Sequence, residues 1–208
     1  MKILTLLLMV IVGCCAKENL QDASFLFYKS SDTSRVVLKP NITEPLINMT
    51  VCLEVYTDVV RRDSLFKLQA NNYSKPHFHL YQIRDHYYIT IDEDQVIYKT
   101  TKETMRWRKI CVSWEYVTGV VHFWVNGNLF PRRVLNPGFL IYPDSLAVLG
   151  QSLASAGLGS YRGEPTFVGE IKNVNMWDRA PYTWETYGNI IDWRYVEYET
   201  YGAVILYL

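Results

Sequence analysis

Residues 108–127 read RKICVSWEYVTGVVHFWVNG, and this stretch decides the fold. In its first half Ile110, Val112, Trp114 and Tyr116 alternate with more polar residues, which predicts a strand with one apolar face. Thr118-Gly119 supply a turn, and the almost continuously apolar second half is typical of a strand buried between two sheets. The pair at 126–127 is Asn-Gly, which favours a two-residue hairpin turn because both residues tolerate positive φ. The hairpin is expected to place a cysteine and two tryptophans in the core.

Short strand-like segments continue on both sides of this hairpin. They are bounded by turn residues, among them the sequences RRD at 61–63 and DED at 92–94, and the aromatic content is 14%. Many short strands with regular turn signals indicate an antiparallel β-sandwich. Strands are predicted at 25–28, 35–39, 49–57, 64–68, 77–81, 87–91, 96–98, 146–151, 167–178 and 192–199.

The N-terminus reads as a secretory signal. Residues 1–16 carry one early lysine, Lys2, then an apolar run and a small-residue end at Gly13-Cys14-Cys15-Ala16. The run is too short for a membrane span. A buried N-terminal strand and a lipoprotein processing site ending at Cys14 are the alternatives. We expect a secreted chain whose mature domain is 17–208.

Removal of the signal leaves Cys52 and Cys111 as the only cysteines. An even pair in an oxidising compartment indicates one disulfide, and two unpaired buried thiols are the alternative. A bridge between these positions would restrict the unfolded chain by roughly 4 kcal/mol in the loop-entropy treatment.

The charge balance excludes some partners. Basic and acidic residues number 21 each, so no field suited to nucleic acid or to an anionic membrane is expected. The run 92–94 is the only dense acidic segment, and it reads as a turn rather than as a calcium or catalytic cluster. With no nucleophile motif and no histidine paired with a plausible serine, we do not expect an enzyme; a glycosidase with paired carboxylates is the alternative.

Three histidines and three sequons remain as candidate sites. His77 and His79 share one strand face, a spacing that zinc can use, although a polar solvent face is the simpler interpretation. His122 is expected to be a hydrogen-bonded core residue. Asn-x-Ser/Thr sequons, which mark sites for N-linked glycans, occur at Asn41, Asn48 and Asn72.

Several motifs resemble the pentraxin family. The family signature is His-x-Cys-x-Ser/Thr-Trp-x-Ser/Thr, and this chain keeps the Cys, Ser and Trp but has Lys109 and Glu115 at the outer places. Pentraxins also share an aromatic segment followed by Ser-Asp-Thr-Ser, a Thr-Val-Cys-Leu strand, Val-Gly-Asp/Glu-Ile with Val-Asn-Met-Trp-Asp, and a late Asn-Trp-Arg. The matching segments here lie at 25–38, 50–53, 168–178 and 192–194. The chain is therefore identified as a member of this family.

The resemblance implies a fold and an assembly. Pentraxins are flattened antiparallel jelly rolls of the concanavalin A-like, lectin-like kind with one short helix, which would fall at Trp184–Ile190. They are secreted recognition proteins of innate immunity, assembled as a homo-oligomeric ring that is usually a pentamer. The family also bonds the cysteine of its Thr-Val-Cys-Leu strand to that of its signature, here Cys52 to Cys111.

Family members bind two calcium ions that bridge to phosphocholine, phosphoethanolamine or sugars. Calcium needs six to eight oxygen ligands. Leu153, Ala154 and Pro165 offer no side-chain oxygen, whereas Lys75 and Arg162 add positive charge. A shifted alignment recovers only Glu164 and Asn71 with Asn72. We expect calcium to be lost or weakened as a cofactor. The matching positions are Ser74, Lys75, Ser152, Leu153, Ala154, Arg162 and Pro165.

The family's choline pocket falls on Leu80 and Gln95. Leu80 preserves apolar contact, but the neutral Gln95 removes the charge partner of a quaternary ammonium. We therefore expect a lectin-like recognition protein whose ligand is a glycan, a phospholipid headgroup or a protein. An active calcium-dependent pentraxin and a structural ring without ligand are the alternatives.

Overall fold

The computed structural model describes residues 19–70, 76–101, 105–151, 167–181 and 185–208. The expected signal segment lies outside these residues. In the described part, every regular element is a strand. The strands are β1 (Ser24–Phe27), β2 (Arg35–Lys39), β3 (Asn48–Tyr56), β4 (Arg62–Ala70), β5 (Phe78–Ile83), β6 (His86–Ile91), β7 (Asp94–Lys99), β8 (Arg108–Glu115), β9 (Val120–Val125), β10 (Asn128–Leu129), β11 (Arg133–Val134), β12 (Ser145–Leu149), β13 (Gly169–Trp177), β14 (Glu197–Tyr201) and β15 (Val204–Tyr207).

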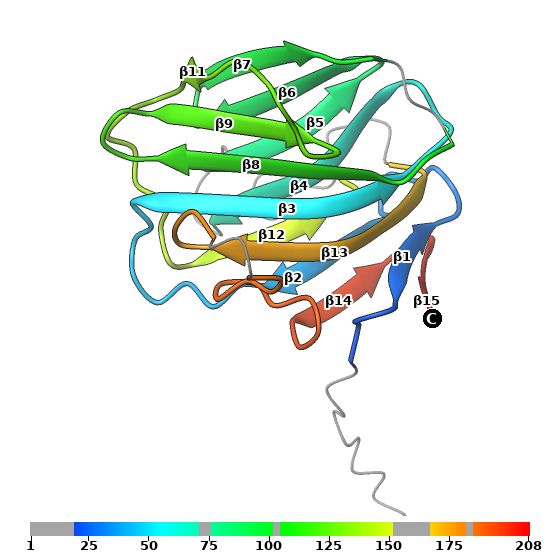
Figure 1. Ribbon diagram of the computed structural model, residues 1–208. Coiled ribbons are helices and arrows are strands. Elements are labelled where there is room, and N and C mark those ends of the chain that lie inside the picture. The colour runs from blue at the N-terminus through cyan, green and yellow to red at the C-terminus, as the bar shows by residue number, and fades with distance from the viewer. Residues whose placement is uncertain (1–18, 71–75, 102–104, 152–166, 182–184) are drawn as a thin grey trace, which may run out of the picture.

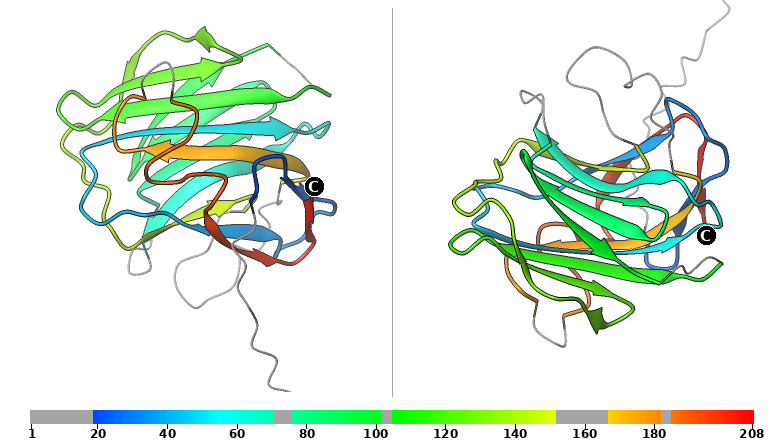
Figure 2. Two further views of the ribbon diagram at one scale, coloured as in Figure 1. Left: turned by 60° about the horizontal axis from the view of Figure 1, so that its bottom comes forward. Right: turned by 90° about the horizontal axis from the view of Figure 1, so that it is seen from above.

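The strands form two antiparallel sheets that stack face to face (Figures 1 and 2). Sheet A has the order β10-β9-β8-β3-β13-β1-β15, with β11 also paired to β9. Sheet B has the order β14-β2-β12-β4-β5-β6-β7. Neighbours in each sheet are mostly far apart in sequence, as the jelly-roll expectation requires. The predicted all-β sandwich is confirmed.

The core lies between the two sheets and is rich in aromatic rings. Phe25, Phe66 and Phe123 are fully buried, and the ring of Phe25 meets Trp193 edge to face at 5.5 Å. Edge-to-face pairs of this kind add to the large apolar area that each aromatic side chain buries. Members of the core come from both sheets, so the sandwich is one hydrophobic unit.

The hairpin at 108–127 forms as β8 and β9, paired from Ile110↔Val125 to Trp114↔Val121. Trp114 is buried, and its Nε1 donates to the carbonyl of Leu135 at 2.8 Å. The other core expectations for this hairpin are wrong: Cys111, His122 and Trp124 are half-buried on the outer face. Because side chains alternate along β9, Val121 and Phe123 fill the inner face and leave their neighbours outside.

Two predicted turns are confirmed. Asn126 and Gly127 have φ of 51° and 79°, and they connect the paired residues Val125 and Asn128. The acidic run forms the equivalent turn between β6 and β7, where Asp92 has a φ of 53°. The carboxylates at 92–94 therefore serve a hairpin.

The predicted disulfide is present between Cys52 and Cys111. The two cysteines are direct partners in the register of β3 and β8. They lie on the outer face of sheet A, in line with Trp124. The bridge therefore joins central strands of one sheet and does not cross the core.

The expected helix at Trp184–Ile190 is not found over residues 185–190. The amides of Gly188 and Trp193 both donate to Oδ1 of Asn175 at 3.2 Å. The amides of Ile190 and Ile191 donate to the carbonyl of Met176. This segment follows β13 because its backbone groups bond to that strand rather than to one another.

Two strand boundaries also differ from expectation. β4 begins at Arg62, so Arg62 and Asp63 belong to a strand and not to the predicted turn. At the C-terminus, β14 begins at Glu197, and β15 is an additional edge strand paired with β1. The described part of the chain contains no helix long and apolar enough to cross a membrane.

Candidate functional site

Of the two positions expected to form a choline pocket, Gln95 lies on the outer face of sheet B. One row of side chains crosses this face from β2 to β7. Val148 and Lys67 in the middle of the row are buried, whereas Gln95 at its end is exposed. The row consists of Val37, Val148, Lys67, His79, Thr90 and Gln95.

The positions matched to calcium ligands lie outside the described residues, and so does Asn72. They follow β4 and β12, which are neighbouring central strands of sheet B. These positions remain predictions. They are Ser74, Lys75, Ser152, Leu153, Ala154, Arg162 and Pro165.

Gln95 is held by a tyrosine pair. Its Oε1 accepts a hydrogen bond from the hydroxyl of Tyr81 at 2.7 Å. Tyr81 stacks on Tyr88 across the strand pair, with ring centroids 4.8 Å apart. The guanidinium of Arg62 lies 4.9 Å from the centroid of the Tyr81 ring. The face beside Gln95 therefore combines an amide, aromatic rings and a cation.

Leu80 lies on the opposite face of β5. It is fully buried in the core between the sheets, in register with Phe66 and Ile89. Leu80 therefore shares no surface with Gln95. Among the described residues, Tyr81 is the β5 side chain that contacts Gln95.

His79 and His77 are buried, so the predicted polar solvent face is wrong. Nε2 of His79 lies 2.9 Å from Oγ of Ser64. Burial, together with the charges of Lys67 and Arg62, lowers the pKa of His79 to about 3. Burial also lowers the pKa of His77, against the opposing effects of Asp144 and Asp92. At neutral pH His79 is an uncharged hydrogen-bonding group.

The structure does pair histidines with serines, contrary to expectation. His79 meets Ser64, and Nδ1 of His77 lies 3.0 Å from Oγ of Ser145. Both serines are buried, at 7% and 2% exposed. A catalytic nucleophile must be reached by its substrate, and burial of both hydroxyls is the feature of a hydrogen-bonded scaffold.

No group of three or more metal-binding side chains (His, Cys, Asp or Glu) occurs in the described ranges. His77 and His79 engage serines instead. The charged neighbours of His79 are the cations Lys67 and Arg62. In its described part, this face therefore presents positive charges, rather than a group of carboxylates, to a divalent ion.

A second polar group lies at the end of the sandwich. Arg108 projects inward from β8, is only 6% exposed, and donates from Nη1 to Oε1 of Gln82 at 3.1 Å and to the hydroxyl of Tyr87 at 2.7 Å. The alternation that predicted Ile110, Val112 and Trp114 on one face also places residue 108 there. That signal was present in the sequence but was not used.

Asp63 belongs to the same group. Burial raises its pKa to about 6, opposed by hydrogen bonds from Arg61 and Gln82 and by the charges of Arg61 and Arg108. Nε of Arg61 lies 3.3 Å from Oδ1 of Asp63. Residues 61–63 were expected to form a turn, which gave no reason to predict a buried carboxylate at Asp63.

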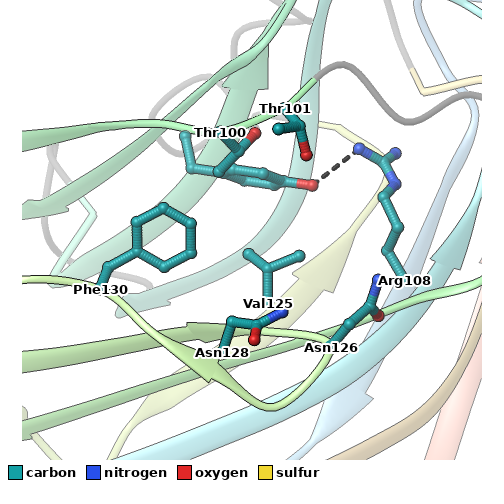
Figure 3. Close-up of a pocket in the computed structure, with 8 residues that line it drawn as sticks. Thr100, Thr101, Arg108, Val125, Asn126, Asn128 and Phe130 are labelled. Atoms are coloured by element: carbon teal, nitrogen blue, oxygen red, sulfur yellow. Dashed lines mark hydrogen bonds between the residues drawn. The ribbon is translucent and has the colours of Figure 1, made fainter.

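A cavity of about 50 Å³ adjoins Arg108 between the β6–β7 and β8–β10 ends (Figure 3). A wider cleft of about 450 Å³ lies elsewhere, along the end of β2 and residues 189–197. The smaller cavity is lined by Tyr87, Thr100, Thr101, Arg108, Val125, Asn126, Asn128 and Phe130.

The two described sequons differ in exposure. Asn41 is exposed and lines the wider cleft. Asn48 is half-buried at the start of β3. Its sequon threonine, Thr50, is buried, with Oγ1 3.1 Å from Oγ of Ser113. The geometry therefore favours Asn41 as the accessible acceptor.

Comparison with known proteins identifies relatives along the whole described domain. The model of the Pentaxin family matches residues 23–207. The C-reactive protein of Xenopus laevis is 35% identical over 211 residues, covering 92% of this chain and 85% of that protein. The mucosal pentraxin of Mus musculus is 30% identical over 206 residues, covering 97% and 94%.

A solved structure shows the same fold. The heptameric SAP-like pentraxin of Limulus polyphemus superposes with a TM-score of 0.75 at 18% identity, covering 88% of this chain and 94% of that one. The identity is low, so this likeness concerns the fold.

Proposed function

This chain belongs to the pentraxin family, and from that premise we propose that it is a secreted, ring-forming recognition protein whose ligand binds with lost or weakened calcium dependence. Membership supports a pentraxin-like recognition protein rather than an enzyme. The buried Ser64–His79 and Ser145–His77 pairs are assigned a structural role. Secretion rests on the signal-like residues 1–16 and on the kinship with C-reactive protein.

The observation that carries the proposal is the chemistry around Gln95. Its carbonyl is taken by Tyr81, and its neutral amide supplies no counter-charge for a choline cation. Arg62 lies over the same tyrosine ring. Arg62 would repel a cationic ligand or a divalent ion here. Two like unit charges 4 Å apart near a protein surface repel each other by about 4 kcal/mol before screening.

The ligand class that this face supports best is a neutral glycan. Tyr88, Thr90 and Gln95 are partly or fully exposed and present an aromatic ring, a hydroxyl and an amide. Aromatic surface beside a few placed polar groups is the pattern of sites for uncharged polar ligands. We propose that a sugar stacks on the partly exposed ring of Tyr88, which the buried Tyr81 supports from behind, and hydrogen-bonds to Gln95.

Calcium titration of the purified mature chain tests the calcium part. An ion that binds only the folded state must raise the melting temperature. We expect no saturable heat in calorimetry at micromolar calcium and equal melting temperatures in calcium and in chelator. Micromolar binding with a clear shift would contradict the proposal and restore the calcium-dependent phosphocholine interpretation.

Gln95→Glu tests the ligand part. Introducing a carboxylate should improve binding of phosphocholine by up to about fivefold, because an exposed ion pair with a quaternary ammonium contributes up to about 1 kcal/mol. Asn189→Asp adds the same charge at an exposed residue outside sheet B and should leave binding unchanged. Tight phosphocholine binding by the unmodified chain, or an equal gain in both variants, would count against the role of Gln95.

A further inference from the structure

The starting point is Arg108, a buried guanidinium whose hydrogen-bond partners are neutral. Nη1 donates to the Gln82 carbonyl and the Tyr87 hydroxyl, and Nε has no partner among the described residues. A buried charge costs free energy unless a counter-charge and full hydrogen bonding offset it. Arg108 is therefore a cation placed in the core without complete compensation.

The nearby carboxylate does not complete the balance. Asp63 forms its ion pair with Arg61, at 3.3 Å, and acts on Arg108 only through its charge. The described residues therefore give Arg108 no directly bonded counter-charge.

The cavity of about 50 Å³ is lined by Arg108. One water needs ~10–15 Å³ of such space, so the cavity accommodates a group of a few heavy atoms. Figure 3 shows the Arg108 guanidinium and the Thr101 side chain at one end of the cavity, with Phe130 at the other. Asn128 approaches from the β9–β10 turn. The lining thus combines one cation with hydroxyl and amide donors and an aromatic wall.

We propose that this cavity binds a small oxyanion group, a carboxylate or a phosphoryl group, with Arg108 as its counter-charge. Guanidinium bonds to oxyanions are charge-assisted and stronger than those to neutral acceptors. Thr101 and Asn128 are in place to orient the remaining oxygens. The site lies between the sheets and is separate from the outer face that carries Gln95, so it stands independently of the glycan proposal.

The test is calorimetric titration of the purified mature chain with inorganic phosphate and, separately, with acetate at fixed ionic strength. Saturable binding of either ion supports the site, and the ion that binds identifies the source as phosphoryl or carboxylate. Arg108→Gln should weaken that binding about tenfold or more, because a charge-assisted bond is lost. Arg132→Gln removes an exposed arginine bonded to His122 and should leave binding unchanged.

A second variant covers the case in which Arg108→Gln does not fold. Asn128→Leu keeps Arg108 and replaces an exposed amide with an apolar side chain of similar size. It should weaken binding severalfold without changing the fold. No saturable binding of either ion would overturn the proposal. Equal losses in Arg132→Gln and Arg108→Gln would also overturn it, because the ion would then be adventitious only.

Discussion

At the scale of single residues, two buried titratable groups set opposing pH dependences. His79 has a pKa lowered to about 3 by burial beside Lys67 and Arg62. Acid therefore protonates the unfolded chain first, and stability falls as the pH drops below about 6.5. Asp63 has a pKa raised to about 6 by burial, against Arg61, Gln82 and Arg108. The stabilisation that protonated Asp63 gives the folded state is lost as the pH rises from about 4 through 6.

Single variants should separate these effects. When the pH falls from 7 to 5, titration of His79 lowers the unfolding free energy by about 2 kcal/mol, and titration of Asp63 raises it by about 1 kcal/mol. Relative to the unmodified chain, His79→Gln should therefore be more stable at pH 5 than at pH 7, whereas Asp63→Asn should be less stable at pH 5 than at pH 7. Urea unfolding at fixed protein concentration across this range measures both.

A matched control for this prediction is Thr90→Ser, at the cross-strand neighbour of His79, because it changes no titratable group. It should reproduce the pH slope of the unmodified chain. Identical slopes in His79→Gln and the unmodified chain would show that His79 takes up its proton in the folded state. The pKa assignment would then fail.

At the scale of elements, Gly150 fixes how β12 leaves sheet B beside β1. Its φ is 81°, and a Cβ there would lie 2.2 Å from Cε1 of Phe27. The carbonyl of Gly150 accepts from the amide of Phe167, whose ring meets Phe27 edge to face. The glycine is therefore needed for its conformation and for the close approach of an aromatic ring.

Gly150→Ala should lower the unfolding free energy by about 2–4 kcal/mol, the sum of backbone strain and overpacking. Gly138→Ala is the matched control: its φ is 83°, but nothing lies within 4 Å of the added Cβ. That variant should lose only about 1 kcal/mol, the cost of the conformation alone. Equal losses in chemical denaturation would mean that Phe27 moves aside freely.

At the scale of the whole molecule, sheet A presents apolar side chains at both of its edges. Leu129 and Val134 are exposed at the β10–β11 edge, and Ile205 and Tyr207 at the β15 edge. Exposed strand edges pair readily with another chain. Contact between two different edges is heterologous, and heterologous contacts close into rings when the rotation permits. The two edges are therefore candidate ring contacts.

If the proposed ring uses these two edges, Leu129→Glu and Ile205→Glu should each give monomers, because each variant disables one edge. A mixture of the two should form a dimer, since one intact β10–β11 edge meets one intact β15 edge. Light scattering after size exclusion measures these masses. Val117→Glu, at an exposed turn, should keep the ring. Rings that survive in both edge variants would place the contacts elsewhere.

The sequence determined most of the fold. Alternation in β8 and the Asn126-Gly127 turn are local patterns, and both were confirmed because strand period and turn chemistry follow from neighbouring residues. The disulfide between Cys52 and Cys111 was predicted from the number of cysteines and from the family resemblance, and it is also confirmed. Kinship with the pentraxins was also readable from short motifs such as those around Trp114 and Trp177. The calcium and sequon positions outside the described residues remain predictions.

The tertiary structure alone decided which face each group occupies. His79 is buried beside Ser64 and Lys67 of β4, and Arg108 is buried against Gln82 and Tyr87 of the opposite sheet. Residues 185–190 follow β13 because Asn175 and Met176 accept their backbone hydrogen bonds. β15 forms by pairing with the edge strand β1, and local sequence propensity does not predict such a pairing. Burial, pairing and charge balance depend on residues far apart in sequence, so the pocket at Arg108 emerged only when the sheets were placed together.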